Sequence, residues 1–131
     1  MYKRSKMLGK TVVLSDTIGV ATKEEVSLWT DMIKENNLKA AIHIHHSGDE
    51  QKALRTVRDA LFEGITEIDS SIGGLGGCPF VKESGANLST ETLVRHLNAW
   101  GFDCGVTEKK LRPALKIVRE IKNIQELMLV K

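Results

Sequence analysis

The chain has 131 residues, of which 41% are hydrophobic and 27% are charged. This size fits a single domain over residues 1–131 with one core, and it excludes two domains. The 19 basic and 17 acidic residues give a net charge of +2, which is too balanced to indicate a nucleic-acid partner. No apolar run approaches the ~20 residues of a membrane helix, so no membrane partner is expected.

The amino terminus lacks the apolar core of a signal peptide. Its basic opening, MYKRSK, could contact a phosphate but is more typical of a solvated terminus. Without an export signal, Cys78 and Cys104 are expected to be free thiols in a reducing compartment. These features predict a cytoplasmic protein.

Apolar spacing and turn signals divide the chain into alternating strands and helices. The predicted elements, in chain order, are a strand at 11–14, a helix that begins at a capping box of Thr22 and Glu25, a strand at 40–45, a helix that begins within 47–50, a strand at 66–72, a helix from about Ser89 and a helical tail at 107–131. Pro113 predicts a kink or a fresh start inside the tail, because proline donates no backbone hydrogen bond.

Strands that alternate with helices predict an α/β fold whose parallel strands are joined by right-handed crossovers. In such sheets the working groups lie in the loops at the carboxyl ends of the strands. The loops at 15–22, 45–50 and 73–87 follow the three predicted strands, and they hold most of the reactive side chains. The sequence therefore predicts a functional site at this edge of the sheet.

The segment AAIHIHH, residues 40–46, ends the second predicted strand with three histidines. Because side chains alternate along a strand, His43 and His45 should share one face, while His46 points to the other. Two imidazoles on one face can bind one metal ion, or they can form a hydrogen-bonded pair near the strand end. His96 falls in a predicted helix and is interpreted as a surface residue.

Two polar residues lie at the ends of these loops. Asp16 ends the first strand, where a carboxylate can serve as a metal ligand, a base or an orienting group. It can equally form an Asx turn or a helix start. Asn87 either caps the following helix or offers its amide oxygen to a metal. The residues alone leave these alternatives open.

The segment GGLGGCP is the richest in glycine. It fails the dinucleotide-binding fingerprint, because Pro79 stands where the third glycine should be. A loop of this kind can let the backbone approach a ligand, act as a lid that carries a thiol, or form a plain wide turn. Its glycines and thiol are Gly73, Gly74, Gly76, Gly77 and Cys78.

Together, the segments LSDTIGVAT, AIHIHH, EIDSSIGGLGGCPF and GANLSTETLVRHLNAWGFDCGV resemble the carboxyl-terminal part of hydroxymethylglutaryl-CoA lyase. That family belongs to the metal-dependent TIM-barrel lyases, aldolases and synthases. The resemblance spans about residues 11–115. It implies a partial (β/α)8 TIM barrel, with three parallel β/α units over about 11–101 that match the last three barrel strands, and a helical tail over about 107–131.

The resemblance also implies roles for individual residues. It makes His43, His45 and Asn87 ligands of a divalent cation, Mg²⁺ or Mn²⁺. It places His43 in catalysis as well, together with Asp16, which takes part in proton transfer in the family. Cys78 matches the catalytic thiol that the glycine loop carries.

The implied reaction is the retro-Claisen cleavage of a 3-hydroxyacyl-CoA. The metal binds the hydroxyl and carboxylate oxygens of the substrate, a base removes the hydroxyl proton, and the C–C bond breaks to give a keto product and the enolate of acetyl-CoA. A positioned acid then protonates the enolate, shielded from water by Cys78 and its loop. This loop favours a lyase over the related synthases and aldolases that act on a 2-oxo acid.

The resemblance covers three of the eight strands of a TIM barrel. The arginine and the metal-ligand aspartate on the family's first strand have no counterpart here. Three isolated strands would also leave two apolar edges open. We therefore expect a fragment, a complementary amino-terminal barrel chain as partner, or a homo-oligomer. The alternative function is a non-catalytic module that binds a metal or a partner chain.

Overall fold

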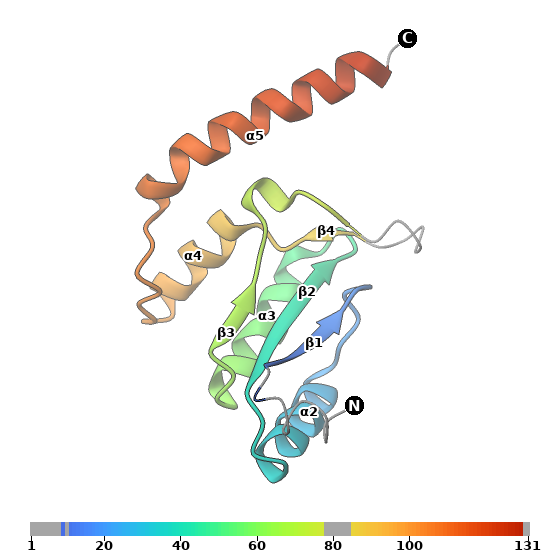
Figure 1. The fold of residues 1–131 in the computed structure, drawn as a ribbon, viewed down its shortest axis with the longest axis vertical. Coiled ribbons are helices and arrows are strands. Elements are labelled where there is room, and N and C mark those ends of the chain that lie inside the picture. Colours follow the sequence, from blue (N-terminus) through green and yellow to red (C-terminus); the bar gives the residue numbers. More distant parts are fainter. Residues whose placement is uncertain (1–8, 10, 78–84, 130–131) are drawn as a thin grey trace.

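The computed structural model describes residue 9, residues 11–77 and residues 85–129, with side chains as far as residue 123. Strands and helices alternate along the first two thirds of the chain, as predicted (Figure 1). The elements are β1 (Val12–Asp16), α2 (Lys23–Glu35), β2 (Ala40–His46), α3 (Glu50–Phe62), β3 (Glu67–Asp69), the 3₁₀ turn η1 (Ile72–Gly74), β4 (Ala86–Asn87), α4 (Thr90–Ala99) and α5 (Glu108–Leu129).

The strands β1, β2 and β3 form a parallel sheet with β2 in the centre. In register, Ser15 on β1 and Asp69 on β3 both stand opposite His43 on β2. Helix α3 lies against β2, and α2 packs beside α3 (Figure 1). The predicted α/β fold with parallel strands joined by helices is confirmed.

The core fills the space between the sheet and these two helices. Ile42 and Ile44 point from β2 into it and are completely or almost completely buried. Leu54 and Val57 of α3 and Val26 of α2 meet them there. The apolar stripes predicted for both helices therefore face the sheet, as helical spacing requires.

The opposite face of the sheet is not covered by helices in the described part of the chain. Val13, on this face of β1, is 48% exposed, and Glu67 and Asp69 of β3 are exposed as well. Parallel sheets normally have both faces covered. This second face, called the open face below, is exposed at the outer strands β1 and β3, whereas Ala41 and His45 of the central strand are buried.

Local sequence signals set the helix starts. Thr22 Oγ1 accepts the Glu25 N–H at 3.2 Å, and the Glu25 carboxylate accepts the Thr22 N–H at 2.8 Å, so the predicted capping box is confirmed. Asp49 caps α3 by accepting the Lys52 N–H. Ser89 caps α4, where the sequence predicts its start. These caps satisfy N–H groups that have no partner inside a helix.

Three features differ from the sequence predictions. The strand predicted at 66–72 is shorter, because β3 ends at Asp69 and Ile72 lies in η1. Strand β4 pairs antiparallel with the end of β2, in a segment predicted as a loop. Helix α5 runs through Pro113 as one helix, so the expected fresh start is wrong. Pro113 lies in the second helical turn and removes one N–H donor, while Leu111, Leu115 and Val118 form a half-buried to buried stripe along the helix.

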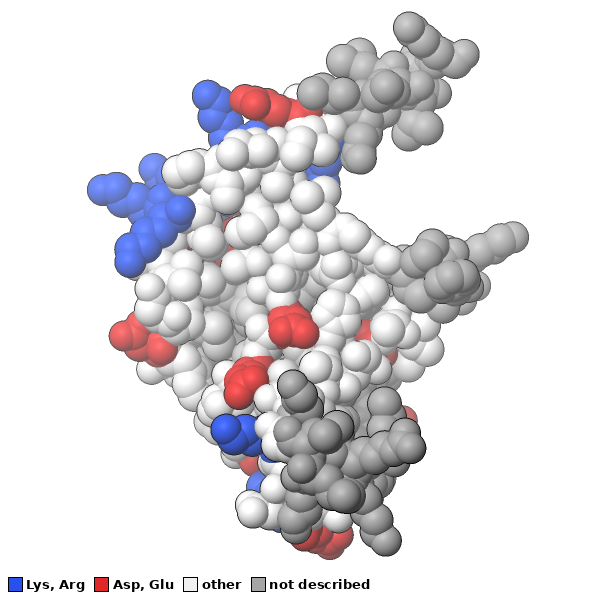
Figure 2. Space-filling view, viewed as in Figure 1, with Lys and Arg blue, Asp and Glu red and all other residues white. Residues whose placement is uncertain are grey.

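Charge is unevenly spread over the surface. Figure 2 shows Lys and Arg side chains gathered at the end of the molecule where α5 begins, with Asp and Glu scattered elsewhere on that face. Exposed Lys109, Lys110 and Arg112 belong to this first stretch of α5. Glu108 pairs with Arg95 of α4 at 3.1 Å and anchors α5 to the body. Within the described part of the chain, no helix has the length and apolarity needed to cross a membrane.

Candidate metal centre

Two histidines face one another at the carboxyl end of β2. A hydrogen bond of 2.9 Å joins the Nε2 atoms of His43 and His45, and the ring centroids are 4.9 Å apart. Of the two alternatives for this pair, the hydrogen-bonded one is therefore observed, and a metal ion would take the place of the shared proton. His45 is buried, whereas the side chain of His43 is 29% exposed. The exposed ring gives the pair an opening to solvent. The alternation along the strand thus places two imidazole nitrogens at a single point.

The surroundings of His45 favour its neutral form. Burial lowers its pKa below the usual value, and the neighbouring His43 lowers it further. The negative charge of Asp16 opposes the shift, and His46 adds to it. Neutral imidazole is the form that binds a metal. Burial therefore favours the form of His45 in which an imidazole could bind a metal.

Strand β4 brings Asn87 beside this pair. Asn87 stands opposite His45 in the antiparallel register. Its amide Nδ2 donates to the Leu75 carbonyl at 2.7 Å. Its Oδ1 is buried and accepts no hydrogen bond. Because Ser89 caps α4, the capping role considered for Asn87 is not the one it takes.

Buried polar atoms without partners gather at this place. Among the described residues they are His45 Nδ1, His46 Nδ1 and Asn87 Oδ1. A buried polar atom without a partner costs roughly 1–3 kcal/mol, and native proteins keep few of them. Of the three, only Asn87 Oδ1 is a candidate ligand atom, because the histidine pair meets through Nε2 and His46 lies on the other face of β2.

The candidate donor set combines two imidazole nitrogens, which suit transition-metal ions, with one amide oxygen, which suits Mg²⁺ or Mn²⁺. With metal–nitrogen bonds of about 2.1 Å, two ligands at a right angle lie about 3.0 Å apart, close to the 2.9 Å between the Nε2 atoms. The amide oxygen of Asn87 is a ligand type that Mg²⁺ and Mn²⁺ accept. The described residues contain no cluster of three or more His, Cys, Asp or Glu that could hold a metal. The third donor here is an amide.

Asp16 holds the loop that follows β1. Its carboxylate is almost completely buried and accepts the N–H groups of Gly19 at 2.8 Å and Ala21 at 2.7 Å. A longer bond of 3.4 Å joins it to the N–H of Ile18. Of the alternatives for this residue, the Asx-type turn is the one observed, and its charge also acts on His45.

Two glycines let neighbouring segments approach the end of β2. A side-chain carbon added at Gly19, whose φ is +69°, would lie 2.8 Å from the His45 carbonyl oxygen. One added at Gly85 would overlap the His46 carbonyl oxygen. Neither glycine was singled out from the sequence. Only Gly19 carried a local signal, because it follows Asp16 in a predicted turn.

The glycine loop begins as a tight turn. Gly73, Gly74 and Gly76 all have positive φ values, which glycine adopts at little cost. A side-chain carbon added at Gly76 would lie 2.8 Å from Asn87 Nδ2, so the loop is directly against the candidate ligand. Cys78 and Pro79 lie outside the described residues.

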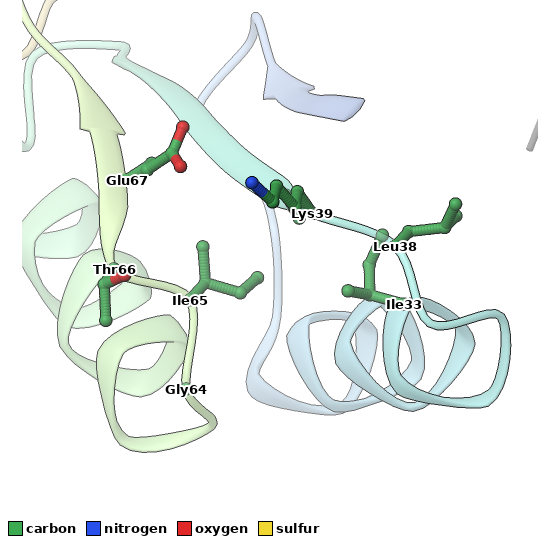
Figure 3. A pocket seen from close by; sticks show the side chains of 8 residues that line it. Ile33, Leu38, Lys39, Gly64, Ile65, Thr66 and Glu67 are labelled. Atoms are coloured by element: carbon green, nitrogen blue, oxygen red, sulfur yellow. The ribbon is translucent and has the colours of Figure 1, made fainter. Parts of the chain in front are cut away.

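The remaining reactive residues lie away from the centre. His96 is half-buried on α4, where its Nδ1 bonds the Thr92 carbonyl, and its ring meets Trp100. Cys104 is exposed and free. At the opposite, amino end of the strands, a groove of about 260 Å³ is lined mainly by Ile33, Leu38 and Ile65, with Lys39 and Glu67 at its rim (Figure 3). This groove brings no set of metal-binding side chains together.

Comparison with known proteins identifies relatives for almost all of the chain. A family described as HMGL-like matches residues 2–118. Mouse cytoplasmic 3-hydroxy-3-methylglutaryl-CoA lyase is 34% identical over 103 residues, which are 79% of this chain and 30% of that protein. Mouse mitochondrial hydroxymethylglutaryl-CoA lyase is 37% identical over the same share of this chain and 32% of its own length.

Solved structures of similar proteins point to the same family. The HMG-CoA lyase from Brucella melitensis superposes with a TM-score of 0.78 at 31% identity, over 93% of this chain and 44% of that one. The Bacillus subtilis enzyme gives 0.71 at 34% identity, over 84% and 37%. The chain thus spans about a third of the curated relatives that it matches. On the strength of the family match over most of its length, the chain belongs to the HMGL-like family of hydroxymethylglutaryl-CoA lyases.

Proposed function

We propose that this chain carries the metal-binding end of a carbon–carbon lyase that cleaves a 3-hydroxyacyl-CoA into acetyl-CoA and a keto product. The observation that supports this most is the pair of imidazole nitrogens 2.9 Å apart, beside a buried amide oxygen without a partner. The related lyases supply the reaction type. The activity of a whole lyase is part of the proposal, because the chain spans about a third of those relatives.

In this proposal His43, His45 and Asn87 would hold Mg²⁺ or Mn²⁺. The cation, when bound, would draw electron density from the substrate hydroxyl and make its proton more acidic. The chain's own groups orient the site. The Leu75 carbonyl fixes the amide of Asn87, and burial favours the neutral form of His45. His43, the more exposed of the pair, is the histidine that a substrate would meet.

The resemblance assigns proton transfer to Asp16 and a catalytic role to Cys78. Asp16 Oδ1 accepts from the N–H groups of Gly19 and Ile18, whereas Oδ2 accepts only from Ala21, so Oδ2 has a second lone pair that could accept a substrate proton. Cys78, which the glycine loop carries, would shield the enolate from water while a positioned acid protonates it. Cys78→Ala should abolish turnover in a lyase. It should change little in an aldolase or synthase that acts on a 2-oxo acid, which makes this substitution the test between the two.

The exposed residues of the open face support the proposal that another chain covers it. We propose that a complementary amino-terminal barrel chain, or a second copy of this chain, covers exposed Val13 and the edges of β1 and β3. Size-exclusion chromatography tests this, since a monomer at micromolar concentration would count against it. The cytoplasmic location stays a prediction, because the lyase relatives include cytoplasmic and mitochondrial forms.

The metal site is tested by titrating the purified chain with Mn²⁺ in a calorimeter. We expect binding to the wild type and a loss of affinity of more than about a hundredfold in His43→Ala and His45→Ala, beyond the effect of losing a group that only orients a ligand. His96→Ala is the matched control and should bind as the wild type does. Equal affinities in all four proteins would refute the site.

A non-catalytic module is the second candidate, favoured by the open sheet face. Such a chain would bind Mn²⁺ or a partner without turnover. An assay with Mn²⁺ and hydroxymethylglutaryl-CoA, with and without an amino-terminal partner chain, separates the two. Acetyl-CoA formed in either condition excludes the module, whereas metal binding without any product in both conditions supports it.

A further inference from the structure

The turn that starts the glycine loop is held from two sides by charged side chains. The Gly73 N–H donates to the Glu91 carboxylate of α4 at 3.0 Å. The Gly73 carbonyl accepts from Lys122 Nζ of α5 at 2.7 Å. Hydrogen bonds to charged groups are shorter and stronger than neutral ones. Both polar backbone atoms of one glycine are therefore fixed by two different helices.

Helix α5 also packs directly on this turn. A side-chain carbon added at Gly73 would lie 2.7 Å from Val118 Cγ1, and φ at Gly73 is +64°. Val118 is buried although most of α5 is exposed. Val118 and Lys122 are one helical turn apart, so they meet the same spot. The contact of α5 with η1 is thus a close fit that requires glycine.

The same turn orients the candidate metal ligand. Two residues after Gly73, the Leu75 carbonyl accepts the amide Nδ2 of Asn87 at 2.7 Å. A carbonyl can accept only from the NH₂ end of an amide. The bond therefore decides which way the amide faces, and it leaves Oδ1 as the buried atom without a partner. If the turn shifts, this orientation is lost.

We propose that Lys122 is a positioning residue for the metal centre. By holding the Gly73 carbonyl it keeps the Leu75 carbonyl in place, and the Leu75 carbonyl presents Asn87 Oδ1 as a ligand. This inference rests on the proposed function. It joins the helical tail to the chemistry at β2 and gives a role to a side chain that touches neither histidine.

The test compares Mn²⁺ affinity in the full chain by calorimetry. Lys122→Met keeps the alkyl stem and removes the donor, and it should weaken binding roughly threefold to tenfold, less than for a group that bonds a metal ligand directly. Lys122→Arg keeps a donor and should restore binding. Lys116→Met, an exposed lysine on the same helix, should bind as the wild type does.

A double substitution shows whether Lys122 acts through Asn87. In an Asn87→Ala background, Lys122→Met should change the affinity by less than about twofold, because the two share one interaction. An effect of full size there would overturn the inference. So would equal affinities of wild type and Lys122→Met when His43→Ala loses binding. If wild type and His43→Ala bind equally, the proposed function fails and this inference fails with it.

Discussion

The two ends of the sheet are built in opposite ways. At the amino end, apolar side chains line an open groove around Ile65 and Leu38. At the carboxyl end lie the buried polar atoms without partners that the described residues contain, and glycines let neighbouring segments come close. The amino end leaves an apolar groove open to solvent, whereas the carboxyl end holds buried polar atoms that have no partner among the described residues. The predictions below test this division.

The core behind the sheet should carry most of the stability. Ile42→Ala removes a completely buried side chain and should lower the free energy of unfolding by about 3 kcal/mol, measured by denaturant titration. The Mn²⁺ affinity of the folded protein should not change. Val13→Ala, on the open face, is the control and should cost less than about 1 kcal/mol. Equal losses of unfolding free energy at both positions would contradict the difference in packing between the two faces of the sheet.

The next largest effect is expected where the segment that leads into β4 approaches the end of β2. Gly85→Ala places a carbon on the His46 carbonyl oxygen and should lower the free energy of unfolding by roughly 2 kcal/mol, because the neighbouring backbone must move. It should also weaken Mn²⁺ binding, since β4 carries Asn87. Gly77→Ala is the control, because its added carbon would lie 3.3 Å from the Gly85 carbonyl oxygen. A tolerated Gly85→Ala would refute the close pairing of β4 with β2.

Acid should weaken the carboxyl end before the amino end. The pKa of His45 lies below its usual value of 6.5, mainly through burial and then through His43. The unfolded chain therefore binds more protons as the pH falls through this range. The stabilisation that the neutral His45 ring provides is fully present above the pKa of the unfolded chain. It is lost as the pH falls towards the lowered pKa of the folded chain.

The measurement is the melting temperature of the metal-free chain between pH 7.5 and 5.5. The melting temperature of the wild type should fall through this histidine as the pH drops, and that of His45→Gln should fall less. His96→Gln, on α4, should follow the wild type. If His45→Gln shows the same slope as the wild type, the site does not disfavour the charged ring.

The anchor of α5 should show the smallest effect. The hydrogen bond from Arg95 lowers the pKa of Glu108, so any stabilisation is present above the usual carboxyl range and is lost in acid. Both side chains are exposed, so Arg95→Met should lower the melting temperature by only a few degrees. Arg58→Met on α3 is the control. A loss as large as that of Ile42→Ala would mean that α5 belongs to the core.

Local signals made much of the fold predictable. The capping box of Thr22 and Glu25 depends only on four consecutive residues. The alternation of side chains along β2 is enough to place the rings of His43 and His45 together. Strand β4 was missed because two residues carry no period and pair only where β2 extends to His46. The Leu75 carbonyl was missed because every residue has a carbonyl. Its role depends on Asn87, 12 residues away.

The polarity of the open face changes along the strands of the sheet. Its register row nearer the amino end holds Val13, Ala41 and Glu67, and the next row holds Ser15, His43 and Asp69. Within about 7 Å along the strands, the surface changes from mostly apolar to wholly polar. A protein that covered this face would need an apolar surface opposite the first row and a polar surface opposite the second row. His43 lies in the polar row, so a partner that covered this face would meet it with polar groups.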